Sequence, residues 1–125
     1  MMPIKYAKAK LSNIQEMQDL ILPEVDNGII LDRSEDEIAT NIRSYILAYQ
    51  EDILVGFTAL HIHTKELAEV RSLIVKDEMR GQKIGEYLVK NALEEAVKLG
   101  IKRVLSLTYK PVSYTHLTLP TMRRV

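Results

Sequence analysis

A short polar turn between an apolar strand-like run and a helical pattern is the part of the chain best suited to hold an anion. It reads Arg80-Gly81-Gln82-Lys83-Ile84-Gly85, and the apolar run before it ends at Val75. The first backbone N–H groups of a helix have no partner within the helix, and the helix dipole favours negative charge there. Glycine lets the backbone approach a phosphate closely, and Arg80 and Lys83 add positive charge. The turn therefore predicts a site for a phosphate-bearing cofactor.

Glu69 is an acidic residue in the middle of the otherwise apolar run from Leu67 to Val75. Because burial of a carboxylate is costly, a half-buried carboxyl group here would have a raised pKa, which suits a proton acceptor. The alternative is an ion pair with Arg71, two residues later on the same face of the strand. The residues alone leave a general base and a structural ion pair equally open.

His61 and His63 also share one face of a strand-like run. Two histidines do not complete a metal site and no third ligand is evident, so we predict no metal. Histidines in this arrangement more often belong to a polar face or line a pocket.

The composition is that of one ordinary globular domain. The chain has 125 residues, of which 46% are hydrophobic and 27% charged, and its 17 basic and 17 acidic side chains cancel. A net charge of zero argues against a nucleic-acid binder that relies on bulk charge. The absence of cysteine excludes disulfides and a cysteine nucleophile. The chain has no signal-peptide pattern and no apolar run of membrane length, so we expect a cytoplasmic protein that does not bind membranes.

Periodicity and capping signals predict elements in the order β-α-α-β-β-β-α-β. The predicted strands are 4–8, 45–49, 53–63, 67–75 and 101–108, and the predicted helices are 12–23, 34–43 and 84–99. Ser12 and Ser34 are expected to cap the first two helices, Pro23 to end the first, and Gly100 to end the third. The last helix joins two strands as a crossover, which predicts that they are parallel.

The last segment of the chain breaks with these patterns. Residues 112–121 read VSYTHLTLPT, which looks like a translation of a widely used sequencing adapter. We therefore predict one domain over 1–111 and a non-native tail over 112–125. The alternative is a genuine threonine-rich edge strand.

The strand, glycine-bearing turn, helix and strand together resemble the acetyl-CoA-binding core of the GNAT N-acetyltransferase superfamily. Its pattern is Gln/Arg-x-x-Gly-x-Gly/Ala: Arg80 and Gly85 fit the first and last positions, and Lys83 departs from the usual glycine. The resemblance implies a GNAT-type α/β (α+β) fold, a mixed and mostly antiparallel sheet flanked by helices. It also implies two acetyl-CoA-binding segments, the strand residues Leu73, Ile74 and Val75 along the pantetheine and the turn residues Arg80, Gly81, Gln82, Lys83, Ile84 and Gly85 at the pyrophosphate.

A narrower resemblance is to the short single-domain form of the N-acetylglutamate synthases. It is carried by the segments LILPEVDNGIILDRSEDEI, LAEVRSLIV and LTYK. In that family the residues at the positions of Arg33 and Ser34 help to bind the glutamate carboxylate, a role that suits a guanidinium and a helix N-terminus. The residues alone would make Arg33 a solvated loop charge and Ser34 a simple helix cap. Arg71 would also line the acceptor site.

The function implied is acetyl-CoA-dependent N-acetylation of the α-amino group of an amino acid, L-glutamate, which begins arginine biosynthesis. Glu69 would be the general base, because the ammonium group must lose a proton before it attacks the thioester. Two alternatives stay open. The acceptor could be another amine or a protein N-terminus, or the chain could be a non-catalytic acetyl-CoA-binding module.

The family fold continues past the fifth strand with a helix and two more strands, and the resemblance implies that these C-terminal elements are missing here. This chain could then be inactive. An exposed edge on the fifth strand would invite association, so a homodimer is one option.

Overall fold

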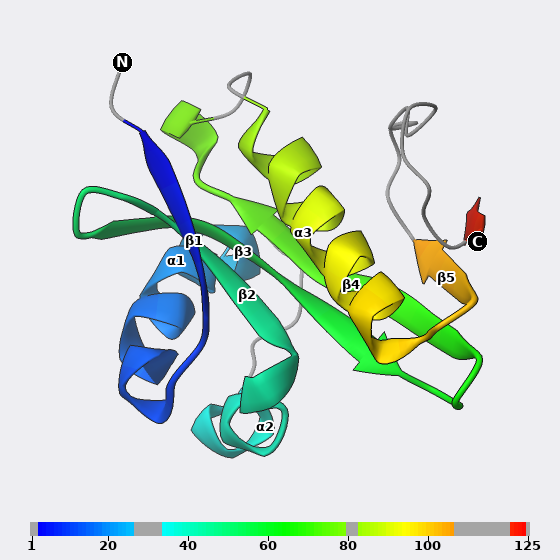
Figure 1. Ribbon diagram of the computed structural model, residues 1–125. Helices are drawn as coiled ribbons and strands as arrows, with labels where there is room; N and C mark the ends of the chain where they lie inside the picture. The colour runs from blue at the N-terminus through cyan, green and yellow to red at the C-terminus, as the bar shows by residue number, and fades with distance from the viewer. Residues whose placement is uncertain (1–2, 27–33, 80–82, 107–120, 125) are drawn as a thin grey trace.

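The computed structural model describes residues 3–26, 34–79, 83–106 and 121–124 (Figure 1). Its helices are α1 (Ile14–Asp26), α2 (Glu35–Thr40) and α3 (Ile84–Leu99), with 3-10 turns at Leu11–Asn13, Ile42–Ser44 and Asp77–Met79. Its strands are β1 (Ile4–Lys8), β2 (Tyr45–Gln50), β3 (Ile53–Ile62), β4 (Leu67–Val75), β5 (Arg103–Ser106) and β6 (Thr121–Arg124). In these ranges no helix is long and apolar enough to cross a membrane.

The strands form one sheet in the order β1-β2-β3-β4-β5-β6. Neighbours from β1 to β4 pair antiparallel, whereas β4 with β5 and β5 with β6 pair parallel. The parallel pair β4–β5 is joined through α3, as a crossover requires. The predicted fold class is confirmed, and so is the predicted order of elements as far as the fifth strand.

Helices cover both faces of the sheet (Figure 1). On one face α3 buries Leu88 and Leu93 against the strands. On the other face α1 and α2 bury Met17 and Ile38 in a second cluster that includes Phe57 of β3. Because side chains alternate along a strand, successive residues enter different cores, and each core holds its own helix layer in place.

The start and end of α1 differ from the prediction. Ser12 does not cap the helix, because it lies inside the 3-10 turn, where Oδ1 of Asn13 accepts a hydrogen bond of 2.8 Å from Lys10 N–H. The helix also continues to Asp26, past Pro23. Proline removes one helical hydrogen bond, but α1 packs its apolar stripe on the sheet, and such packing can outweigh a local preference.

The other helix ends follow the predicted signals more closely. Ser34 caps α2, since its hydroxyl oxygen accepts a hydrogen bond of 3.1 Å from Glu37 N–H. α2 ends at Thr40 rather than near Arg43, because a separate 3-10 turn leads into β2. α3 spans the predicted residues and ends at Gly100, whose φ of +85° is a left-handed conformation that suits glycine.

β6 is the strand that the predicted order lacks. It pairs with the outer edge of β5, Arg103 opposite Thr121 and Val104 opposite Met122. The edge of β5 that was expected to be exposed is therefore paired with β6, and β6 forms the edge of the sheet instead. The boundary between a domain at 1–111 and a non-native tail at 112–125 stays a prediction.

Candidate active site

A β-bulge interrupts β4 at its middle. Ala59 of β3 lies opposite Arg71, but the next pair towards the start of β3 joins Phe57 to Ile74, so β4 accommodates an extra residue. Ser72, inside this irregular stretch, has a φ of +56°, which is unusual for a residue other than glycine. The bulge separates the part of β4 that carries Glu69 and Arg71 from the part that carries Leu73 to Val75.

Thr58 stabilises the bulge from the neighbouring strand. Its side chain is fully buried, and its hydroxyl donates a hydrogen bond of 2.9 Å to the carbonyl oxygen of Arg71. A bulge disturbs the regular ladder, so a buried carbonyl at this point needs another donor. The threonine hydroxyl supplies that donor.

The end of β4 meets the start of α3, which brings the two predicted coenzyme segments together. The recorded pairing of β4 with β5 covers Leu67–Val70, and β4 continues to Val75 beyond it. A Cβ atom built on Gly85 would lie 3.5 Å from Cγ2 of Val75 and 3.8 Å from Cδ2 of Leu73, which is ordinary van der Waals contact. The strand residues Leu73 and Val75 therefore pack directly beneath the first turn of α3.

The turn before α3 is described only in part. Arg80, Gly81 and Gln82 lie outside the described residues, so their predicted role stays a prediction. Lys83 has φ +63° and ψ +18°, a left-handed conformation, and its carbonyl accepts a hydrogen bond of 3.0 Å from Tyr87 N–H. Lys83 stands where the family pattern has glycine, the residue that adopts this conformation without steric cost.

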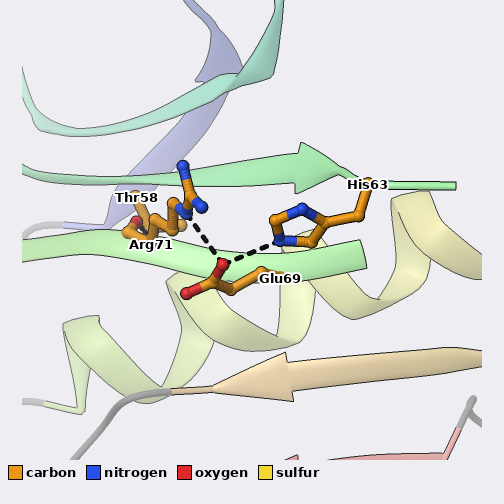
Figure 2. A network of polar contacts seen from close by, with 4 residues as sticks. All are labelled: Thr58, His63, Glu69 and Arg71. Atoms are coloured by element: carbon orange, nitrogen blue, oxygen red, sulfur yellow. Dashed lines mark hydrogen bonds and ion pairs between the residues drawn. The ribbon is translucent and has the colours of Figure 1, made fainter. Parts of the chain in front are cut away.

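Glu69 lies in a network of polar contacts on β3 and β4 (Figure 2). It is 8% exposed, and one carboxylate oxygen, Oε1, is 2.8 Å from Nε of Arg71 and 2.9 Å from Nε2 of His63. The ion pair with Arg71 that the sequence left open is therefore present. It does not exclude catalysis, because ion pairs also occur within active sites.

The pKa of Glu69 is lowered, whereas the sequence predicted that burial would raise it. Burial does act to raise the pKa, but the hydrogen bonds from His63 and Arg71 and their charges outweigh it. The prediction was wrong because it considered burial without partners. Glu69 is consequently ionised at neutral pH and can accept a proton, but its lowered pKa makes it a weaker base than the sequence predicted.

His63 is the member of this network that sequence reasoning missed. It was treated, together with His61, as a polar-face residue. The hairpin between β3 and β4 is tight, His63 N–H donating to the Leu67 carbonyl over 2.9 Å, and this places the His63 ring beside Glu69. The available signal was the alternation of side chains along the two strands of the hairpin, which puts His63, Leu67 and Glu69 on the same face.

His61 lies next to His63 without contacting Glu69 by a recorded hydrogen bond. The two rings meet edge to face with centroids 4.8 Å apart. Partial burial lowers the pKa of His61, and the nearby Arg71 and His63 lower it further. Among the described residues no cluster of three or more potential ligands is placed to hold a metal ion.

The two residues predicted to bind a glutamate carboxylate are not both described. Arg33 lies outside the described residues, and Ser34 has the helix-capping contact described above. No recorded contact within the described residues joins Ser34 to Glu69 or Arg71. Their part in an acceptor site stays a prediction.

A mixed sheet with an α-helical crossover between β4 and β5 and helices on both faces has the architecture of the GNAT acyl-CoA N-acyltransferase fold. The chain belongs to the acetyltransferase (GNAT) family, whose profile matches residues 12–113. It is 28% identical over 107 residues to an amino-acid acetyltransferase of Aeromonas salmonicida, covering 85% of this chain and 24% of that protein. It is 32% identical over 100 residues to an uncharacterised N-acetyltransferase of Chlorobaculum tepidum, covering 80% and 64% of the two chains.

Solved structures show the same fold. N-acetylglutamate synthase from Neisseria gonorrhoeae, complexed with coenzyme A and N-acetyl-glutamate, superposes with a TM-score of 0.79 at 24% identity, over 86% of this chain and 26% of that one. A Mycobacterium tuberculosis protein in complex with CoA superposes with a TM-score of 0.73 at 27% identity, over 85% and 65%. The chain thus spans about a quarter of the length of the amino-acid acetyltransferase and of the synthase.

Proposed function

We propose that this chain transfers the acetyl group of acetyl-CoA to the α-amino group of an amino acid, and that the amino acid is L-glutamate. The single observation that carries the proposal is the buried, ionised carboxylate of Glu69 on β4, the strand whose end lies under the first turn of α3. The relatives named amino-acid acetyltransferase and the neighbour named N-acetylglutamate synthase support it. The product would be N-acetylglutamate, made in the cytoplasm as the first intermediate of arginine biosynthesis.

The described residues fit acetyl-CoA at the junction of β4 and α3. The first N–H groups of α3 and the Lys83 ammonium would attract the pyrophosphate, together with Arg80, Gly81 and Gln82. The backbone of Leu73 to Val75, which lies beyond the part of β4 that pairs with the described residues of β5, would hold the pantetheine by hydrogen bonds. Bound acetyl-CoA supplies the thioester, whose carbon–sulfur bond breaks as the new carbon–nitrogen bond forms. Backbone N–H groups past the bulge would orient its carbonyl oxygen.

Glu69 and Arg71 together suit an acceptor that carries both charges. Glu69 would take the proton from the acceptor ammonium, directly or through a water molecule, so that the amine can attack. Arg71 is 43% exposed and uses its Nε donor on Glu69, and a guanidinium has further N–H donors for a carboxylate. An amino acid presents an ammonium and a carboxylate a few ångströms apart. Arg33 and Ser34 would bind a second carboxylate, which favours glutamate.

The test is to measure CoA release with each amino acid in turn, together with simple amines and peptides that have a free N-terminus. We expect release with L-glutamate, and a loss of at least ~100-fold in kcat for Glu69→Gln. Glu66→Gln is the matched control, because Glu66 is an exposed acidic residue just before β4. Release that depends on peptides or other amines instead would identify a different acceptor. Coenzyme binding without release for any acceptor would identify a binding module.

A further inference from the structure

Both recorded partners of Glu69 contact the same carboxylate oxygen. His63 Nε2 and Arg71 Nε lie 2.9 Å and 2.8 Å from Oε1, and in the described part of the chain no hydrogen bond reaches Oε2 (Figure 2). A carboxylate held in this way cannot rotate freely about its last bond without losing two hydrogen bonds. One oxygen is fixed, and as far as the described residues are concerned the other keeps its lone pairs for a proton or a water molecule.

We propose that His63 is a positioning residue for Glu69: its Nε2–H holds Oε1, keeps the buried carboxylate ionised and leaves Oε2 to take the proton from the acceptor. This inference rests on the proposed acetyl transfer for its catalytic meaning. Its geometric part, the control of Glu69 by His63, stands on the contact itself.

The hydrogen bond from His63 reaches Glu69 from outside β4, the strand that carries both Glu69 and Arg71. The effect of His63 on Glu69 is therefore separate from that of Arg71. Arg71 and Glu69 are neighbours on β4, whereas His63 follows the end of β3 and reaches across the hairpin. The Glu69 side chain is 10% exposed, so water can replace a lost donor only poorly. Loss of His63 would leave burial acting against a single remaining donor, and burial favours the protonated carboxyl group.

Among the described residues, the charged and titratable groups that act on this carboxylate lie on β3, just after it and on β4. They are His63 and Arg71, which contact the carboxylate directly, and His61, whose charge interacts with that of Glu69. β5 places the uncharged Leu105 opposite Glu69 in the parallel register. The effect of pH on Glu69 therefore depends on two histidines and one arginine, and of the histidines only His63 donates directly to it in the described structure.

The experiment is a carboxyl NMR titration of the whole chain labelled with ¹³C at the glutamate side chains, with the Glu69 signal assigned by its loss in Glu69→Gln. We expect the pKa of Glu69 to rise by about one pH unit in His63→Phe and His63→Leu, which cannot donate a hydrogen bond. His63→Gln retains an N–H donor, and should restore part of the lower pKa. Two non-donating variants are used so that one misfolded protein does not decide the result, and thermal melting checks each fold.

His61→Phe is the matched control, because it replaces the neighbouring imidazole on the same strand face with an uncharged ring that cannot donate a hydrogen bond, and leaves His63 unchanged. It should move the Glu69 titration much less than His63→Phe does. An unchanged titration in both non-donating variants, or an equal rise in His61→Phe, would overturn the proposal.

The catalytic part is read from the pH profile of kcat/KM, whose acid limb should move to higher pH by the same amount in His63→Phe. If no acceptor gives any turnover, the proposed function fails, and the titration alone still decides whether His63 controls Glu69. If turnover is present and its acid limb does not follow the titration, Glu69 is not the base and the positioning role is overturned.

Discussion

A Cβ atom built on Gly56 would lie 2.9 Å from the carbonyl oxygen of Ile74, which is closer than real Cβ contacts allow. The same atom would lie 3.2 Å from Cδ1 of Leu88 on α3. Gly56 of β3 is therefore enclosed by β4 on one side and α3 on the other. Because Gly56 has no side chain, the first turns of α3 can pack close to the sheet. This close packing fixes the distance between β4 and the start of α3, where we propose that the coenzyme binds.

Gly56→Ala should destabilise the fold by about 1–3 kcal/mol, because the added methyl group must displace a backbone carbonyl in a packed core. Gly85→Ala is the matched control, since its Cβ would make only ordinary contacts with Val75 and Leu73. Urea unfolding of the two variants measures the difference. Equal losses would mean that the close approach at Gly56 is not what limits α3.

Thr58→Val should cost about 1–3 kcal/mol, because it removes the buried donor to the Arg71 carbonyl while keeping the side-chain shape. Thr58→Ser keeps the hydroxyl and loses only a methyl group, so it should cost less. Chemical denaturation ranks the two variants. A serine variant less stable than the valine variant would show that Thr58 acts through packing instead of through its hydrogen bond.

Lys83→Gly should leave stability unchanged or raise it by up to about 1.5 kcal/mol. It relieves a left-handed conformation that costs an ordinary residue roughly 1–2 kcal/mol, against the roughly 0.5–1 kcal/mol of flexibility that glycine adds. Thermal melting without ligand measures this effect. The stabilising shift produced by coenzyme A should shrink in the same variant, because a positive charge beside the α3 N-terminus is lost. A stability loss above ~1 kcal/mol would contradict the strain argument.

The lowered pKa of Glu69 predicts how stability depends on pH. A carboxyl group whose folded pKa lies below its unfolded value adds stability above the unfolded pKa, and this stability is lost as pH falls through the folded pKa. The wild-type chain should therefore lose more stability than Glu69→Gln between about pH 5 and pH 3. Denaturant midpoints across that range give the two slopes. Parallel slopes would show that Glu69 has the same pKa folded and unfolded.

Patterns local to the chain were enough to predict most elements of the fold. Leu67–Val75 and Ile84–Leu99 were predicted with their observed ends, and Gly100 was recognised as the end of α3. Each depends on periodicity or on a capping residue, which act within a few residues of the sequence. Pro23 was misread for the same reason: its local effect was predicted, and the packing that overrides it is not local.

The residue types indicated some members of the candidate site, but not His63 and not the pKa of Glu69. An acid in an apolar strand indicated Glu69 as a candidate base, and the turn from Arg80 to Gly85 indicated a candidate cofactor segment, which stays a prediction. Nothing in the residue types marked the bulge at Ser72, which depends on how β3 and β4 align.

The order of apolar and polar residues was thus sufficient to predict the first five strands, the three helices and the position of an acidic group within a strand. The tertiary structure determined the pKa of that acidic group. The pKa of Glu69 is the sum of burial, which raises it, and of donors from His63 and Arg71, which lower it. The His63 term exists only because the register of the hairpin brings one ring within 2.9 Å of one carboxylate oxygen.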